Sequence, residues 1–212
     1  MWEGVFGDAF RSLLVSSTAT LLASLIGIPL GVYLGLKRIP GKKILKSAIY
    51  TLYGFPPVVM GLIVYLLLSS TGPLGFLHLI FSLEAIVLAE FLLALPLVLG
   101  ITMMSVSSIP REVSDAIKIL GGRRWQSLYL YLREARNGII TAVMVGFGSA
   151  ISEVGAAMMV GGGIEGHTSV LTTAIMVETR MGNFEIALAL SAVLLFLCFL
   201  IYGILTRLED TE

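Results

Sequence analysis

Hydroxyl side chains and glycines gather between Ser149 and Thr173, within a strongly apolar part of the chain. The hydroxyls are neutral hydrogen-bond donors: Thr168, Ser169, Thr172 and Thr173. The run Gly161-Gly162-Gly163 offers backbone N–H groups that an anion could approach closely. Neutral donors suit an anion in transit, because fixed positive charges would hold it too tightly to let it leave. The pattern predicts an anion path or gate and not a catalytic centre.

Glu153 is the ionisable residue of this stretch. A carboxylate inside an apolar helix is costly unless it faces the interior of a helix bundle, water or a partner. Ser152 and Gly155, with Gly148, give the same helix a small-residue face that allows close helix contact. Two interpretations stay open: these residues line the path, or Glu153 is a structural hydrogen-bond anchor. Glu90, also within an apolar segment, is expected to be structural.

A second group of residues, between Ser105 and Asn137, has the pattern of a docking surface. Pro110 and Arg111 open a helix, and Glu112 and Asp115 follow in its first turn, where acids suit the helix dipole. Apolar residues then recur at helical spacing on both sides of Gly121-Gly122: Ile117, Leu120, Trp125, Leu128 and Leu132. Two short amphipathic helices joined by a glycine turn could dock into a groove of a partner. The alternative is a solvated basic loop.

Catalytic or metal chemistry has few candidate residues. The two histidines, His78 and His167, are far apart in sequence, and the single cysteine, Cys198, lies in an apolar run. A metal site or a nucleophile–base pair needs several such groups close together. We therefore expect no catalytic residue and no metal ligands.

Composition identifies the surroundings that must position these residues. Hydrophobic residues make up 57% of the 212 and charged residues 13%, and the mean hydropathy is +0.95. Soluble domains carry roughly a quarter charged residues, so one soluble core could not bury this much apolar surface. The formal net charge is zero, which gives no basic field for nucleic acid.

Five segments are long and apolar enough to cross hydrocarbon about 30 Å thick, which takes about 20 helical residues. They are Leu13–Leu36, Ile44–Leu68, about 79–104, about 138–160 and Ile186–Leu205. Pro56-Pro57 predicts a kink or break in the second. Between the last two, the run Val170–Val177 is too short to span and predicts a re-entrant or membrane-resting helix. The sequence predicts an all-α integral membrane protein with five transmembrane helices.

Basic residues are unevenly divided between the two sides of these segments. Twelve lie in alternate connections and after the last segment: Lys37, Arg38, Lys42, Lys43, Lys46, Arg111, Lys118, Arg123, Arg124, Arg133, Arg136 and Arg207. Only Arg11 and Arg180 lie on the opposite side. Basic residues favour the cytoplasm, so the N-terminus is expected outside and the C-terminus inside. Met1–Asp8 has no basic n-region, and we expect the first segment to be retained as a helix.

The stretch Asp115-Ala116-Ile117-Lys118-Ile119-Leu120-Gly121 resembles the EAA motif, the coupling loop in permease subunits of ABC importers. Ala116 and Gly121 match that motif. Asp115 stands where glutamate is usual, Ile117 replaces the second small residue, and Arg133-Glu134 replaces the usual Leu-Pro. The resemblance implies that the coupling loop consists of residues 105–137 and includes Glu112, Asp115, Ala116, Gly121, Arg124 and Trp125.

The stretch Glu153-Val-Gly-Ala-Ala-Met-Met-Val-Gly-Gly162 is similar to permeases for tetrahedral oxyanions, and most to the tungstate type. Molybdate and sulfate relatives more often carry Glu-Phe-Gly there, and both remain alternatives. Resemblance covers nearly the whole chain, including Gly27-Ile-Pro-Leu-Gly31. It implies one permease domain over residues 1–212 with an outer segment at 161–185. The pathway or gate residues would be Ser152, Glu153, Gly155, Gly161, Gly162, Thr168 and Thr172.

The same resemblance implies the assembly in which the chain works. It would be a type I importer permease in a prokaryotic plasma membrane, forming a homodimer. Two cytoplasmic ATPase subunits would bind ATP and magnesium, and this chain would bind no cofactor. An extracytoplasmic binding protein would deliver the anion. Two other classes are alternatives. One is a proton-coupled carrier that uses Glu90 and Glu153, although such carriers usually show internal repeats and the five segments do not divide into two matching halves. The other is a membrane enzyme.

Overall fold

The computed structural model describes residues 2–37, 40–120 and 124–210, which form ten α-helices, one short 3-10 helix and no strand. Three helices are long and apolar enough to cross a membrane: α1 (Trp2–Leu36), α4 (Leu83–Ser107) and α10 (Phe184–Asp210). Two sharply bent helix pairs pass the same test: α2 (Lys42–Tyr53) with α3 (Pro57–Leu68), and α7 (Arg136–Ile151) with α8 (Gly155–Gly161). Counting each pair as one span gives the five expected crossings.

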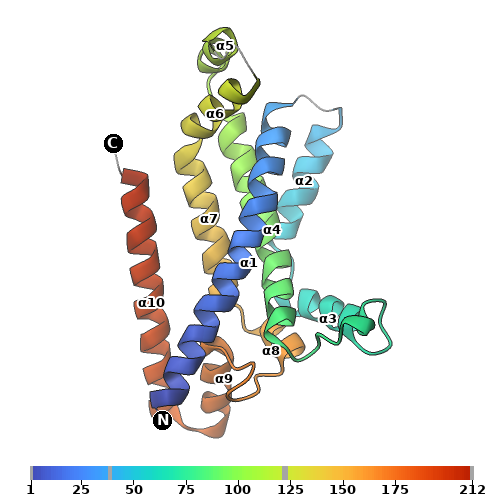
Figure 1. Ribbon diagram of the computed structural model, residues 1–212, viewed down its shortest axis with the longest axis vertical. Coiled ribbons are helices and arrows are strands. Elements are labelled where there is room, and N and C mark those ends of the chain that lie inside the picture. The colour runs from blue at the N-terminus through green and yellow to red at the C-terminus, as the bar shows by residue number, and fades with distance from the viewer. Residues whose placement is uncertain (1, 38–39, 121–123, 211–212) are drawn as a thin grey trace.

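Helix α1 packs along α4 through the centre of the bundle (Figure 1). Gly27, Gly31 and Gly35 recur every fourth residue on its contact face and let the two backbones approach closely. A Cβ atom at Gly31 would lie 2.6 Å from the carbonyl oxygen of Leu99 and 2.8 Å from the Cβ of Thr102. These glycines interrupt an apolar run in the sequence, and in the structure they form the contact itself.

The first crossing begins earlier than its apolar run predicts. Helix α1 starts at Trp2 rather than Leu13, so Asp8 and Arg11 lie within a regular helix. Hydropathy misses these residues because they are charged, although the backbone helix continues through them. The Arg11 side chain bonds to residues 162–170, which we name the outer loop, and Asp8 pairs with Arg11.

The second predicted segment, Ile44–Leu68, is two helices and not one bent helix. Helices α2 and α3 meet at 94° across the break at Gly54–Pro56. Pro56 is extended, with φ −62° and ψ 120°, and Pro57 is the first residue of α3. A residue before proline avoids the helical region, and proline itself suits a first helical turn. Helix α3 therefore leaves the bundle sideways (Figure 1).

The fourth predicted segment, about 138–160, is also broken. Helices α7 and α8 meet at 57°, with Ser152–Val154 between them. Helix α8 packs closely against α3, because glycines at the contact leave room for the other helix. A Cβ at Gly61 on α3 would lie 2.7 Å from the Cα of Ala156 on α8. A Cβ at Gly155 would lie 2.7 Å from Cγ2 of Val58. The two half-length helices thus support each other.

The main hydrophobic cluster lies where α3, α4 and α8 meet. Its larger buried members are Val15, Val64, Leu68, Ile86, Leu93 and Val160. A 3-10 helix (Gly75–Leu77) follows α3, and the Ser82 hydroxyl then caps α4 by accepting the Ala85 N–H at 3.3 Å. The connection between them is tied to α8, because the Phe81 N–H donates to the Val160 carbonyl at 2.8 Å.

The two long connections lie at opposite ends of the bundle (Figure 1). One holds α5 (Arg111–Leu120) and α6 (Arg124–Glu134), which confirms two short helices there. The Gly121-Gly122 turn between them lies outside the described residues. The other holds α9 (Leu171–Met181), an 11-residue helix that includes most of the predicted short run. It lies beside the N-terminus and the start of α10 (Figure 1).

The α1–α4 contact gives a stability prediction. Gly31→Ala places a methyl group against the α4 backbone, and overpacking costs about 1–3 kcal/mol, so we expect the melting temperature in detergent to fall by about 5 °C. Gly203→Ala is the matched control, because its Cβ meets nothing within 4 Å and alanine is the better helix former. Equal shifts for both variants would contradict glycine-mediated packing of α1 on α4.

Candidate functional site

Glu153 stands in the break between α7 and α8, not inside a continuous helix as its sequence surroundings predict. Its Oε1 accepts the Ala156 N–H at 2.9 Å, and the residue is only 8% exposed. The bond pairs one of the N–H groups left open at the start of α8. Glu153 is therefore a hydrogen-bond anchor, one of the two interpretations left open by the sequence. Its part in anion passage stays a prediction.

Two buried threonines hold the segment that follows. The Thr172 hydroxyl donates to the Glu153 carbonyl oxygen at 2.8 Å, which joins α9 to the helix break. The Thr168 hydroxyl donates to the Gly161 carbonyl oxygen at 2.5 Å and accepts the Ile164 N–H at 3.0 Å. Both hydroxyls are used within the chain here, so contact with an anion would require them to exchange partners.

The glycines at the start of the outer loop allow its backbone to turn. Gly162 and Gly163 have φ of 75° and 60°, a region that side chains disfavour. A Cβ at Gly161 would lie 2.5 Å from Cδ1 of Ile86 on α4. The Gly162 N–H donates to the Met158 carbonyl at 3.0 Å, so this N–H is not the open anion donor that the glycine run suggests.

Ser152 and Gly155 flank Glu153 and differ in their surroundings. Ser152 is exposed, and its hydroxyl donates to the Gly148 carbonyl oxygen at 2.6 Å. Gly155 opens α8 and faces Val58 on α3. The structure thus brings all seven predicted path residues to one helix break and the loop after it: Ser152, Glu153, Gly155, Gly161, Gly162, Thr168 and Thr172.

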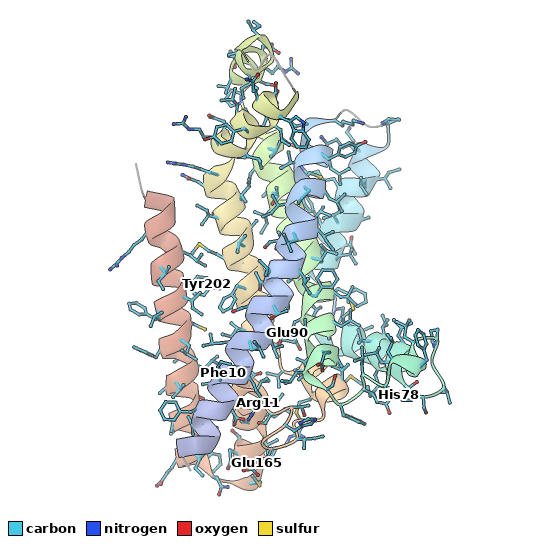
Figure 2. The ribbon with its side chains drawn as sticks, in the orientation of Figure 1. Phe10, Arg11, His78, Glu90, Glu165 and Tyr202 are labelled. Atoms are coloured by element: carbon cyan, nitrogen blue, oxygen red, sulfur yellow. The ribbon has the colours of Figure 1, made fainter. Side chains whose placement is uncertain are left out.

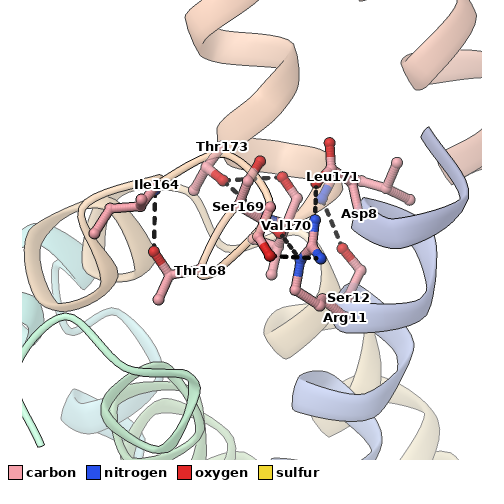
Figure 3. A network of polar contacts seen from close by, with 10 residues as sticks. Asp8, Arg11, Ser12, Ile164, Thr168, Ser169, Val170, Leu171 and Thr173 are labelled. Atoms are coloured by element: carbon pink, nitrogen blue, oxygen red, sulfur yellow. Dashed lines mark hydrogen bonds and ion pairs between the residues drawn. The ribbon is translucent and has the colours of Figure 1, made fainter. Parts of the chain in front are cut away.

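Arg11 ties the outer loop to α1, and sequence reasoning did not find this link (Figure 3). Its Nε donates to the Ser169 carbonyl at 2.7 Å, and its guanidinium pairs with Asp8 at 2.6 Å. The neighbouring Ser12 hydroxyl accepts the Leu171 N–H at 2.7 Å. The signal available was an acid and a base three residues apart before the first apolar run.

Glu90 lies at mid-height of the bundle on α4 (Figure 2). It is only 2% exposed, and its Oε2 has no hydrogen-bond partner. Ser16 on α1 and Glu153 both interact with this carboxyl group. The Ser16 contact supports the structural role expected for Glu90, because it links α1 to α4.

The predicted coupling residues lie at the far end of the molecule. Glu112, Asp115 and Ala116 on α5 are all exposed. Trp125 on α6 is 80% exposed and Ile119 on α5 is 82% exposed. Arg124 begins α6, and Gly121 lies outside the described residues.

Helices α5 and α6 form one unit despite this exposure. The hydroxyls of Ser114 and Tyr131 are 2.9 Å apart, and Ile117 is 6% exposed between the two helices and their neighbours. Apolar side chains that stay exposed on a small, internally bonded unit are typical of a docking surface. We call Ile119, Trp125 and Tyr129, the last 65% exposed, the knob residues.

Metal ligands are not clustered in the part of the chain that the structure describes. No group of three or more histidines, cysteines or acids there could hold a metal ion. His78 ends the 3-10 helix, while His167 lies in the outer loop.

Solved structures identify the fold. The chain superposes on the inward-facing MetNI methionine ABC transporter with a TM-score of 0.74, covering 99% of this chain and 94% of that one at 17% identity. An amino acid ABC transporter gives a TM-score of 0.67, with the same coverage, at 21% identity. The fold is that of a type I ABC importer permease.

The chain belongs to the family described as binding-protein-dependent transport system inner membrane component, which matches residues 27–211. A probable anion ABC transporter permease of Haloferax volcanii is 42% identical, covering 94% of this chain and 88% of that protein. The tungstate uptake permease TupB of Peptoclostridium acidaminophilum is 39% identical, covering 97% and 90%. TupB of Campylobacter jejuni is 36% identical, covering 99% and 87%.

Removing the Arg11 link should loosen the outer loop. Hydrogen bonds to charged groups contribute about 1.5–3 kcal/mol, so Arg11→Gln should speed amide hydrogen exchange at residues 164–171 about tenfold. Arg180→Gln is the control, because Arg180 is an exposed basic residue at the end of α9. Mass spectrometry of peptides from this region measures both. Unchanged exchange in Arg11→Gln would show that the loop is held without it.

Proposed function

We propose that this chain is the permease subunit of an ATP-driven importer for tungstate. The observation that carries the proposal is its 39% and 36% identity to two tungstate uptake permeases, in each case over nearly the full chain. The 42% identity to a probable anion permease supports the same substrate class.

Sulfate and molybdate are the alternatives within this class. A sulfate permease of Synechocystis is 28% identical over 82% of the chain, and a probable molybdenum permease of Haloferax volcanii is 30% identical over 74%. Both match less of the chain and less closely than the tungstate permeases. Tungstate is therefore the first substrate to test.

The proposed orientation places the knob residues in the cytoplasm and the Arg11 link outside. Among the basic residues that the structure describes, most lie at the α5–α6 end, and only Arg11 and Arg180 lie at the opposite end. The positive-inside rule then puts the C-terminus of α10 in the cytoplasm of a prokaryotic cell. In this orientation the outer loop would contact a binding protein, and the knob residues would contact an ATPase.

The knob residues support the proposed ATPase partner. Exposed aromatic and branched side chains gain most from burial in a partner's pocket, and Trp125 is 80% exposed. Two ATPase subunits, one on each copy of the chain, would bind and hydrolyse ATP with magnesium. The permease itself would then need no cofactor.

Helix α3 supports the proposed homodimer. It projects from the bundle (Figure 1), and Val58, Leu62 and Leu66 on it are 44–56% exposed. Twelve residues of helix reach only about 18 Å, too short to cross the hydrocarbon alone. A second copy of the chain is the proposed cover for this face, with the anion path between the two copies.

Alternating access is the proposed mechanism. Closure of the ATPase pair would draw the two α5–α6 units together, and the long helices would carry that motion to the outer end. There the Thr168 and Thr172 hydroxyls would exchange their internal carbonyl partners for the anion. Because these donors are neutral, they would bind the anion weakly enough to release it.

The direct test uses the chain co-purified with its ATPase in lipid and measures ATP hydrolysis. We expect tungstate-loaded binding protein to stimulate hydrolysis, and the sulfate-loaded protein to leave it at the basal rate. Equal stimulation by both loaded proteins would be consistent with the importer role but would contradict selectivity for tungstate. Failure of the chain to assemble with any ATPase would contradict the permease role.

Trp125→Ala tests the knob separately from the substrate. Removing a buried interface tryptophan typically costs 2 kcal/mol or more, so affinity for the ATPase should fall at least tenfold. Phe199→Ala is the matched control, because Phe199 on α10 is 79% exposed but lies far from α5 and α6. Pull-down of the ATPase by each variant provides the measurement. Equal loss in both would contradict docking on α6.

A further inference from the structure

A cavity of about 620 Å³ opens at the basic end of the bundle, where α1 ends and α5 begins. Three cationic side chains line it: Lys37, Lys42 and Arg111. Ser107, Ser114 and Tyr131 add hydroxyl groups. The three cations offer both charge and hydrogen-bond donors to a phosphate group. The hydroxyls already bond Gly35, in the case of Ser107, or each other.

Lys42 is held in place in this cavity. Its Nζ donates to the Gly35 carbonyl at 2.9 Å and to the Lys37 carbonyl at 3.1 Å. An ammonium group has three donors, so one N–H remains for a ligand. Its charge also suits the carbonyl end of α1, where the helix dipole is negative. The cation is therefore fixed by the fold before any ligand arrives.

Arg111 and Lys37 complete the cationic rim. Arg111 is exposed, and no hydrogen bond or ion pair engages it within the described parts of the chain. Lys37 lies 4.3 Å from the centre of the Tyr33 ring and donates to its hydroxyl at 2.6 Å. Asp115 is the one carboxylate among the described lining residues, and it already interacts with another group of the chain.

A second cavity, of about 260 Å³, shares Lys42 and Ser107 with the first. Its other lining residues are Lys43, Lys46, Met103 and Met104. Met104 is 47% exposed, and Ile44 beside these lysines is 78% exposed. A polar, cationic cavity thus adjoins one with an apolar wall, where α2 begins and α4 ends.

We propose that the two cavities together bind one anionic phospholipid. The phosphate would lie among Lys37, Lys42 and Arg111, and the upper acyl chains along Met103, Met104 and the start of α2. A free oxyanion would need only the first cavity, whereas an amphiphile accounts for both. Basic pockets between transmembrane helices at the cytoplasmic side suit anionic headgroups. The bound lipid would join the ends of α1 and α2 to the first turn of α5.

The test uses the chain assembled with its ATPase, stripped of lipid in detergent and titrated with phosphatidylglycerol under native mass spectrometry. Wild type should bind one phosphatidylglycerol per chain in preference to phosphatidylcholine, and millimolar inorganic phosphate should not displace it. The variant Lys37→Gln/Arg111→Gln should bind it about 25-fold more weakly, at about fivefold for each cation removed. Lys42 is left in place, because it also holds the end of α1.

Arg133→Gln/Arg207→Gln is the matched control, since it removes two charges from the same end of the molecule outside both cavities. It should bind phosphatidylglycerol as wild type does. Equal weakening in the two double variants would show a general charge effect and overturn the site. Displacement by inorganic phosphate would assign the cavity to a soluble anion, and equal binding of phosphatidylcholine would remove the role of charge. Either result would overturn the lipid proposal.

Discussion

A backbone group that leaves a helix inside hydrocarbon must find a partner within the protein. Two of the five crossings stop part-way, so this constraint shapes the outer half of the bundle. At the first break Pro56 and Pro57 have no N–H to leave open. At the second, the Glu153 carboxylate accepts the Ala156 N–H, and the Thr172 hydroxyl donates to the Glu153 carbonyl oxygen. Side chains replace the missing helical bonds. These contacts hold α8 against α3 and join α9 to the break that follows α7.

The same contacts explain why the outer loop has one defined shape although it has little regular structure. Thr168 closes the turn after α8, and Arg11 and Ser12 hold its far end from α1. Residues more than 150 positions apart in sequence therefore share one network. The hydroxyls that could meet an anion are the ones that now hold the loop together. Contact with an anion, as proposed, would compete for these donors with the hydrogen bonds that hold the loop.

Much of the fold could be predicted from the sequence, because the length of an apolar run indicates a helix that can cross a bilayer. The two short helices α5 and α6 followed from periodicity around Ile117 and Trp125. Glu153 was found as a residue of interest, but its position at a helix break was not, because its flanking residues are as apolar as a continuous helix. The Arg11 link is a long-range contact that no local pattern encodes. The interaction of Glu90 with Ser16 likewise joins residues of two different helices.

Helix α1 runs without a break from the outer loop to the basic end, through Asp8 and Arg11 at one end and Gly35 at the other. At about 1.5 Å per residue, its 35 residues form a rod roughly 50 Å long. Close glycine contacts with α4 leave little room for it to bend. If binding at one end of this rod changes the affinity for a ligand at the other, the reverse effect must have the same free energy.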